Sequence, residues 1–132
     1  MSRELFWLTL TTAMTALFWV PYILDRIMVR GPAGAMANPS PRDKPQSAWA
    51  QRMMAAHTNA IENLVIFGIL VLTLQDLNIS SRTTAIACAV YFWARLVHFA
   101  VYTAGIPVAR TLAFTVGWLA QAVLVLAIFR LV

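Results

Sequence analysis

Polar side chains recur at helical spacing within the most apolar parts of this 132-residue chain. Tyr91, Arg95, His98 and Tyr102 follow one another at steps of three and four residues. On an α-helix they occupy one face, within an arc of about 60°. A guanidinium, an imidazole and two hydroxyls in one stripe are able to bind an anion and to place a proton donor beside it.

Two further stripes of this kind lie before and after it. Arg52, Asn59 and Glu62 fall within an arc of about 80° on the preceding helix, and Arg110 shares an arc of roughly 40° with Gln121 on the following one. A charged side chain at membrane depth costs a few kcal/mol. We therefore expect the three stripes to face one another or a neighbouring subunit rather than lipid.

Four of these residues, Arg52, His98, Tyr102 and Arg110, predict a cationic, hydroxyl-bearing pocket near one end of the helices. Such a pocket suits an anionic amphipathic ligand, with its charged end in the pocket and any apolar portion between helices. An arginine beside a thiol lowers the pKa of the thiol and favours the nucleophilic thiolate.

A structural interpretation of the same residues stands beside the functional one. Glu62 and Arg95 carry opposite charges about midway along adjacent helices, and a buried ion pair between them, with Asn59 bonded across helices, would fix the helix register. Arg110 would then be an interface arginine that snorkels toward the headgroups. Cys88, in an apolar run, is interpreted as a small buried residue.

The composition places these stripes in a membrane. Hydrophobic residues make up 61% of the chain and charged residues 11%, against roughly 25% charged in soluble domains. The net charge of +5 sits at helix ends and in one loop, which indicates lipid headgroups as the partner and argues against nucleic acid. The sequence has no metal-ligand spacing and no glycine-rich phosphate loop, so we predict no metal site.

The hydropathy pattern predicts an all-α integral membrane four-helix bundle that forms one domain over residues 1–132. The helices are expected at about 5–29, 48–74, 81–102 and 108–131. The first should kink at Pro21, and the proline-rich stretch from Arg30 to Ser47 should be an irregular loop. Gly105 and Pro107 mark a tight turn, with glycine ending one helix and proline starting the next.

The basic residues also predict an orientation. Five of them lie in or beside the first loop (Arg26, Arg30, Arg42, Lys44 and Arg52), whereas the opposite side has only Arg3, Arg82 and Arg130. The positive-inside rule places the first loop in the cytoplasm and both termini outside it. The brevity of the chain suggests a bacterial inner membrane.

Two blocks of sequence resemble the MAPEG family, the membrane-associated proteins in eicosanoid and glutathione metabolism. The stretch from Arg52 to Asn63 (RMMAAHTNAIEN), preceded by Ala37-Asn38-Pro39, resembles the family's second-helix signature and first loop. The stretch from Arg95 to Arg110 (RLVHFAVYTAGIPVAR) resembles its third- and fourth-helix signature. The resemblance covers nearly the whole chain and identifies it as a bacterial-type member.

The resemblance implies a homotrimer that binds glutathione as cofactor between subunits, on the cytoplasmic side. By position, Asn59, Glu62, Arg95, His98 and Tyr102 match residues that hold glutathione, and Arg110 matches the arginine proposed to stabilise its thiolate. Family enzymes add that thiolate to lipophilic electrophiles, reduce lipid peroxides or isomerise a lipid endoperoxide. The chain departs from many members at Ala55 and Thr58, where they carry basic residues, and at Phe114, where some place an aromatic hydroxyl.

Three functions follow as hypotheses. The first is a glutathione transferase or peroxidase acting on hydrophobic or lipid substrates within the membrane, with Arg110 as the catalytic residue. The second is a non-catalytic membrane protein that binds a lipid or small molecule, which the missing basic residues at Ala55 and Thr58 favour. The third, a transporter or channel subunit, fits the buried charges but lacks the inverted repeats and broken helices typical of transporters.

Overall fold

The computed structural model describes all 132 residues and is entirely helical. Its five helices are α1 (Arg3–Leu17), α2 (Trp19–Met36), α3 (Ala48–Asp76), α4 (Arg82–Ala104) and α5 (Pro107–Ile128). α1 and α2 follow one another directly and together form the first span. The chain therefore has four segments long and apolar enough to cross a membrane: Arg3–Met36, Ala48–Asp76, Arg82–Ala104 and Pro107–Ile128. The predicted four-helix membrane architecture is confirmed.

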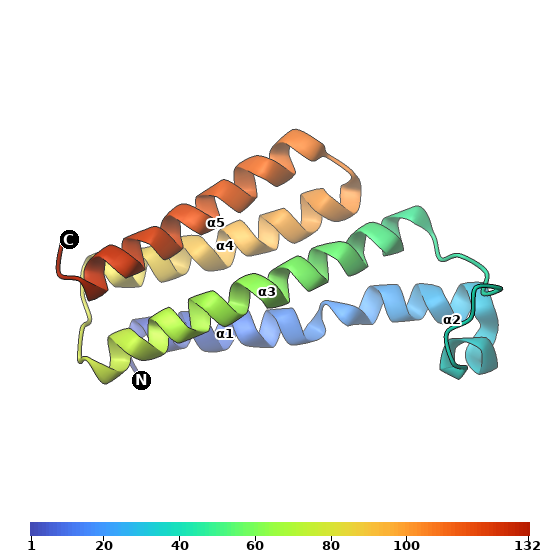
Figure 1. Ribbon diagram of the computed structural model, residues 1–132, viewed down its shortest axis with the longest axis horizontal. Helices are drawn as coiled ribbons and strands as arrows, with labels where there is room; N and C mark the ends of the chain where they lie inside the picture. Colours follow the sequence, from blue (N-terminus) through green and yellow to red (C-terminus); the bar gives the residue numbers. More distant parts are fainter.

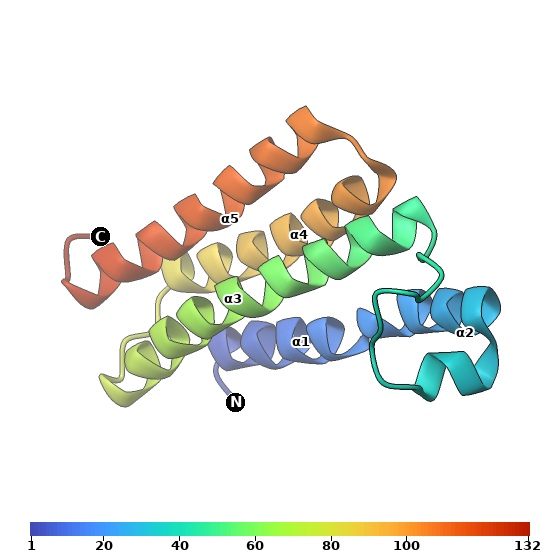
Figure 2. The ribbon, with the colours of Figure 1, turned by 45° about the vertical axis from the view of Figure 1, so that its right-hand side comes forward.

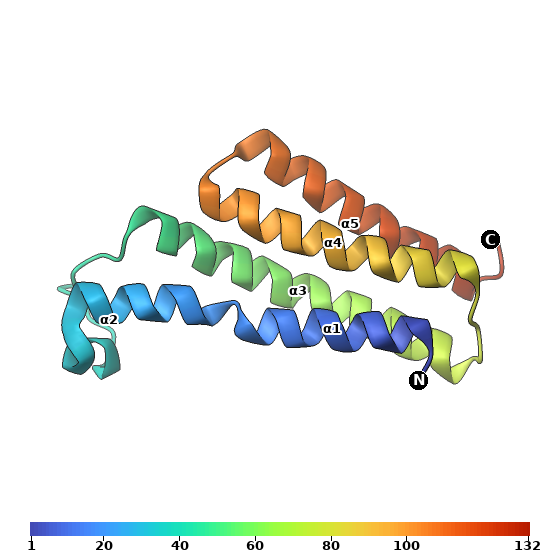
Figure 3. The same cartoon turned by 180° about the vertical axis from the view of Figure 1, so that it is seen from behind.

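The first span is broken between α1 and α2, as Figure 3 shows from behind. Pro21 has no N–H with which to bond the carbonyl of Leu17, four residues earlier. The N–H of Phe18 turns to Thr15, one residue short of the helical partner, at 3.2 Å. The break therefore lies where the sequence predicts a kink. The ring of Phe18 stacks on Phe99 at a centroid distance of 3.6 Å, which packs the break against α4.

The predicted first loop is shorter than expected. Gly31 takes a left-handed conformation (φ 73°) that residues with a Cβ rarely adopt, and the chain resumes helical turns from Pro32 to Met36. Proline suits a first helical position, because its fixed φ is helical and its missing N–H would be unbonded there anyway. The prediction of irregular chain from Arg30 was therefore wrong for this segment, which Figure 2 shows turning away from the axis of α2.

The turn between α4 and α5 follows the sequence prediction. Gly105 ends α4 in the left-handed conformation (φ 79°), and Pro107 occupies the start of α5. The N–H of Gly105 bonds Tyr102 O and that of Ile106 bonds Val101 O, both at 3.0 Å, which caps carbonyls at the helix end. Both termini lie at one end of the bundle, and this turn lies toward the other end (Figure 1).

The apolar core occupies the half of the bundle nearest the termini. Its fully buried residues come from α3, α4 and α5, and the list includes Phe67, Val71, Leu74, Ala87, Cys88, Tyr91, Ala120, Leu124 and Ala127. Phe67 stacks on Tyr91 at a centroid distance of 3.9 Å. The small residues in this set let α4 and α5 approach closely, as is typical of helices packed within membranes.

Two buried acids on the first span accept hydrogen bonds from residues at the starts of the helices that follow. The Glu4 carboxylate accepts from Thr84 Oγ1 at 2.5 Å and from Ser80 Oγ at 3.1 Å, beside the start of α4. The Asp25 carboxylate accepts from Ser47 Oγ at 2.5 Å and from the Ser47 N–H at 3.1 Å, at the start of α3. A negative charge at a helix N-terminus is favourable. The first span thus fixes the starts of α3 and α4 at opposite ends of the bundle.

We predict that Glu4→Ala lowers the free energy of unfolding in detergent by about 2 kcal/mol, because it removes the acceptor of two buried charge-assisted hydrogen bonds. Glu4→Gln, which keeps one acceptor oxygen, should lose less. Thr83→Ala, an exposed change in the same turn as Thr84, is the matched control. Equal stabilities for Glu4→Ala and Thr83→Ala would show that the hydrogen bonds of Glu4 do not stabilise the start of α4.

Candidate functional site

The predicted polar stripes meet in the half of the bundle away from the termini. A pocket of about 270 Å³ lies there between α3, α4 and α5, lined by Asn59, His98, Tyr102, Arg110, Thr111 and Phe114. Four of these are residues that the sequence singles out as candidate site residues. They come together because α4 presents His98 and Tyr102 one turn apart, and the Gly105 turn brings the start of α5 back beside them.

Arg95 lies beside this pocket and is 2% exposed. Its Nη2 donates to Asn59 Oδ1 at 2.6 Å, which joins α4 to α3, while its Nε has no hydrogen-bond partner. Gly117 of α5 packs beside it, and a Cβ there would make an ordinary contact with Arg95 Cδ at 3.6 Å. The guanidinium is therefore held by one neutral amide within the chain.

The predicted ion pair between Glu62 and Arg95 does not form. The one ion pair in the structure is Arg30–Asp43, at 3.6 Å between Nη1 and Oδ2. Glu62 is exposed, whereas Asn59, one turn earlier on α3, contacts Arg95 directly. Asn59 and Glu62 thus lie in one stripe of α3, but only Asn59 contacts Arg95.

Aromatic rings hold the cations of the pocket. The Arg110 guanidinium carbon lies 4.5 Å from the centroid of the Tyr102 ring, and the His98 ring packs edge-on against the same ring at 5.6 Å. Phe114 lies 6.2 Å from His98, between ring centroids, and 6.0 Å from the Arg95 guanidinium carbon. No carboxylate lies within ion-pair distance of Arg110 or Arg95, so the field of the pocket is positive.

Arg52 does not line the pocket. Its Nε donates to the carbonyl oxygen of Thr103 at 2.9 Å, near the end of α4. A Cβ on Gly105 would lie only 3.3 Å from that nitrogen, so glycine is required there for close approach as well as for its backbone angle. The Arg52 side chain therefore joins α3 to the end of α4, where it compensates carbonyls at the negative end of that helix.

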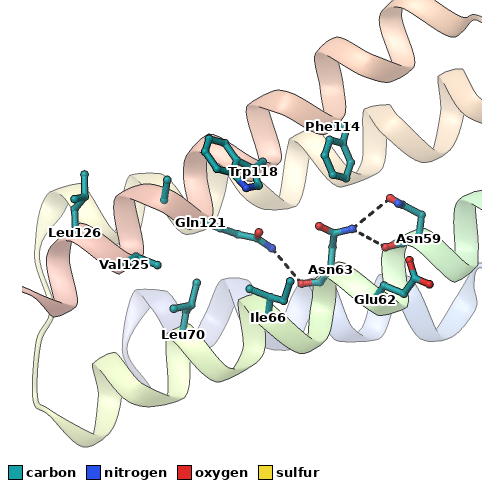
Figure 4. Close-up of a pocket in the computed structure, with 11 residues that line it drawn as sticks. Asn59, Glu62, Asn63, Ile66, Leu70, Phe114, Trp118, Gln121, Val125 and Leu126 are labelled. Carbon is teal, nitrogen blue, oxygen red and sulfur yellow. Dashed lines mark hydrogen bonds between the residues drawn. The ribbon is translucent and has the colours of Figure 1, made fainter.

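An apolar groove of about 700 Å³ continues from the pocket between α3 and α5. Figure 4 shows the residues that line it: Asn59, Glu62, Asn63, Ile66, Leu70, Phe114, Trp118, Gln121, Ala122, Val125 and Leu126. Asn59 and Phe114 line both cavities. The polar pocket and the apolar groove therefore meet at these two side chains.

Hydrogen bonds across the groove link α3 to α5. Gln121 Nε2 donates to the carbonyl oxygen of Asn63 at 3.1 Å, and Asn63 Nδ2 donates to that of Asn59 at 2.9 Å. Both bonds are drawn in Figure 4. On the α4 side, His98 lines the pocket and its Nδ1 is buried without a partner in the chain. A buried polar group left unbonded is costly, so this atom indicates that a polar ligand atom or water belongs in the pocket.

The sequence analysis missed two polar lining residues and the role of two aromatic ones. Asn63 lies one turn from Asn59 on the same face of α3, and this spacing could have identified it as a lining residue. Thr111 follows Arg110 and carries no pattern of its own. Trp118 was not singled out, and Phe114 was noted only for its missing hydroxyl; both line the groove.

Comparison with known proteins gives one result. The model of the MAPEG family matches residues 5–130 of the chain, which includes every residue of the pocket and the groove. No curated protein and no solved structure matches it.

A double-mutant cycle should identify the partner of Arg95. We predict that Asn59→Ala and Arg95→Met are coupled by about 1–2 kcal/mol in stability, because each removes one end of the same buried hydrogen bond. Glu62→Gln and Arg95→Met should be additive within about 0.5 kcal/mol. Chemical unfolding in detergent measures both cycles. Coupling in the Glu62 cycle alone would indicate a Glu62–Arg95 ion pair and contradict the hydrogen bond between Arg95 and Asn59.

Proposed function

The chain belongs to the MAPEG family, and on that premise we propose that it is a membrane-embedded, glutathione-dependent transferase or peroxidase acting on hydrophobic or lipid electrophiles. One observation carries the proposal: a cationic pocket and a long apolar groove share a wall at Asn59 and Phe114. A polar thiol in the first and a lipophilic molecule in the second would meet at that wall.

The pocket fits the thiol end of glutathione. Arg110 is held over the Tyr102 ring and has no carboxylate partner, so its charge is free to stabilise a thiolate. Its position at the start of α5 adds the positive end of that helix dipole. Arg110 is the residue that we assign to catalysis, because it would face the reacting sulfur.

The remaining polar groups suit the peptide backbone. Glutathione is a zwitterion with carboxylates, an ammonium and amides. Glu62 and Asn59 line the side of the groove next to the pocket and present acceptor oxygens for the ammonium and the N–H groups. Arg95, which has an unpartnered buried Nε, and His98 and Tyr102 supply cationic or donor groups on the α4 side. Arg52 would act indirectly, by holding the α4–α5 turn through Thr103.

Two reactions fit this arrangement. In the first, the thiolate sulfur forms a bond to an electrophilic carbon of the substrate, and a proton or a leaving group balances the charge. In the second, a thiolate attacks a hydroperoxide oxygen, the O–O bond breaks to release an alcohol, and a second thiol completes a disulfide and water. In both, the glutathione thiol supplies the electrons. The groove keeps water from the reacting atoms, which strengthens the effect of Arg110.

A non-catalytic role in binding lipids or small molecules is the second candidate. The placement of Arg52 favours it, because that cation is turned to the end of α4 rather than into the pocket. With Ala55 and Thr58 also uncharged, the α3 side offers no cation to a peptide carboxylate. A protein of this kind would bind the apolar part of a lipid in the groove and its headgroup in the pocket.

We also propose that the protein is a homotrimer, as the family resemblance implies. Glu62 is exposed on one chain at the depth of the apolar groove, where contact with lipid would cost a few kcal/mol. A second copy beside α3 would shield it. Neighbouring copies would also close the open side of the groove, so the substrate would react between subunits.

The basic side chains at the far end of α2 support an orientation with that end in the cytoplasm, in a bacterial inner membrane. Arg30 bonds the Lys44 carbonyl and pairs with Asp43, and Arg42 and Lys44 are exposed beside it. These charges would contact anionic headgroups of the cytoplasmic leaflet. The glutathione pocket then lies toward the cytoplasm, where this thiol is held reduced.

Calorimetry with glutathione is the experiment that tests the function. The wild-type protein in detergent should bind glutathione with a dissociation constant between micromolar and millimolar, and Arg110→Ala should lose thiol-transfer activity by about 100-fold or more. Arg82→Ala, an exposed arginine at the other end of the bundle, is the matched control. Loss of folded trimer in Arg110→Ala would make Arg110 structural. Absence of glutathione binding by the wild type at millimolar concentration would favour the lipid-binding alternative.

A topology reporter tests the orientation. Alkaline phosphatase fused after Val132 should be active, because the C-terminus is expected outside the cytoplasm, and green fluorescent protein at the same place should be dark. Native mass spectrometry of the same preparation should give three chains. A fluorescent C-terminal fusion, or a monomer as the main species, would contradict the respective proposal.

A further inference from the structure

The pocket and the groove meet at two shared side chains. Asn59 and Phe114 are the residues that line both cavities. Asn59 is fixed in place, because its Oδ1 accepts from Arg95 at 2.6 Å and its backbone oxygen accepts from Asn63. Phe114 lies on α5 across from it, and Figure 4 shows the ring directed from α5 toward α3 at this level. A molecule that occupies both cavities would therefore lie against this ring.

The Phe114 ring is held between two groups of the pocket. Its centroid lies 6.0 Å from the Arg95 guanidinium carbon and 6.2 Å from the His98 ring centroid. Arg95 and His98 are almost fully buried and come from α4, so the ring has a rigid wall behind it. The other side of the ring faces the groove between α3 and α5, where a ligand would contact it.

Beyond the ring the groove suits a straight chain. Its lining beyond the junction is mainly aliphatic, with Ile66 and Leu70 from α3 and Val125 and Leu126 from α5. Asn59 and Leu70 are eleven residues apart on α3, which corresponds to about 16 Å at 1.5 Å per helical residue. A groove of that length accepts an extended alkyl chain along its axis.

We propose that Phe114 is a specificity-determining residue, which restricts the substrate to one with a single unbranched chain next to its reacting atom. This inference rests on the proposed function, because it places the sulfur of glutathione on the pocket side of the ring. The substrate class is a straight-chain amphiphile, such as a fatty-acyl electrophile or hydroperoxide. A carbon that carries several bulky groups collides with Phe114 before it reaches the sulfur.

Binding of two S-substituted glutathiones tests the inference without turnover. S-octylglutathione carries a straight chain that can pass the ring, and S-tritylglutathione carries three aromatic rings on the carbon bonded to sulfur. Calorimetry on the purified full-length protein in detergent, with unmodified glutathione alongside, gives the ratio of their dissociation constants. The variants are Phe114→Ala, Phe114→Tyr and Leu112→Ala, the last being an exposed change two residues away, on the opposite face of α5.

The wild type should prefer the octyl conjugate, and Phe114→Ala should narrow that preference by roughly ten-fold, because removing the ring opens the junction. Phe114→Tyr, which keeps the ring, and Leu112→Ala should keep the wild-type ratio. An unchanged ratio in Phe114→Ala, with glutathione still bound, would overturn the inference alone. Failure of the wild type to bind glutathione would overturn the proposed function and the inference with it.

Discussion

The hydrogen bond between Arg95 Nη2 and Asn59 Oδ1, 2.6 Å long, is the interaction on which the site depends. It places a buried guanidinium within the membrane with a neutral partner, whereas a buried charge is normally paired with an opposite one. Gly117 packs beside it, and the centroid of the Phe114 ring lies 6.0 Å from the guanidinium carbon. The cost of this arrangement is a reason to expect an anionic group from outside the chain. The pocket, its positive field and the unpartnered His98 Nδ1 are consistent with that expectation.

The rest of the bundle is built to hold this charge without filling the groove beside it. Glu4 and Asp25 on the first span accept hydrogen bonds from the starts of α4 and α3 at opposite ends, which fixes the position of these two helices. α5 is attached at the Gly105 turn and packs closely on α4 through small residues. It meets α3 across the open groove, with Gln121 bonded to the Asn63 carbonyl. Separation of α3 from α5 is therefore what creates space for a lipophilic ligand.

Much of this arrangement could be predicted from the sequence. Hydropathy located the four spans, Gly105 and Pro107 located the last turn, and the spacing of Arg95, His98 and Tyr102 located the buried face of α4. The partners of individual side chains could not be predicted, because a helical stripe gives a direction and not a contact. Asn59 rather than Glu62 meets Arg95, and Arg52 turns to Thr103. The extra turn after Gly31 was missed because two glycines and a proline within four residues also fit a loop.

A structure of the protein with bound S-octylglutathione would test the central claim most directly. We expect the peptide to bind between α3, α4 and α5, with its sulfur near Arg110 and its octyl chain past Phe114 along the α3–α5 groove. An octyl chain on the outer face of α4 and α5, against Trp93 and Val97, or a peptide with no contact to Arg110, would contradict it.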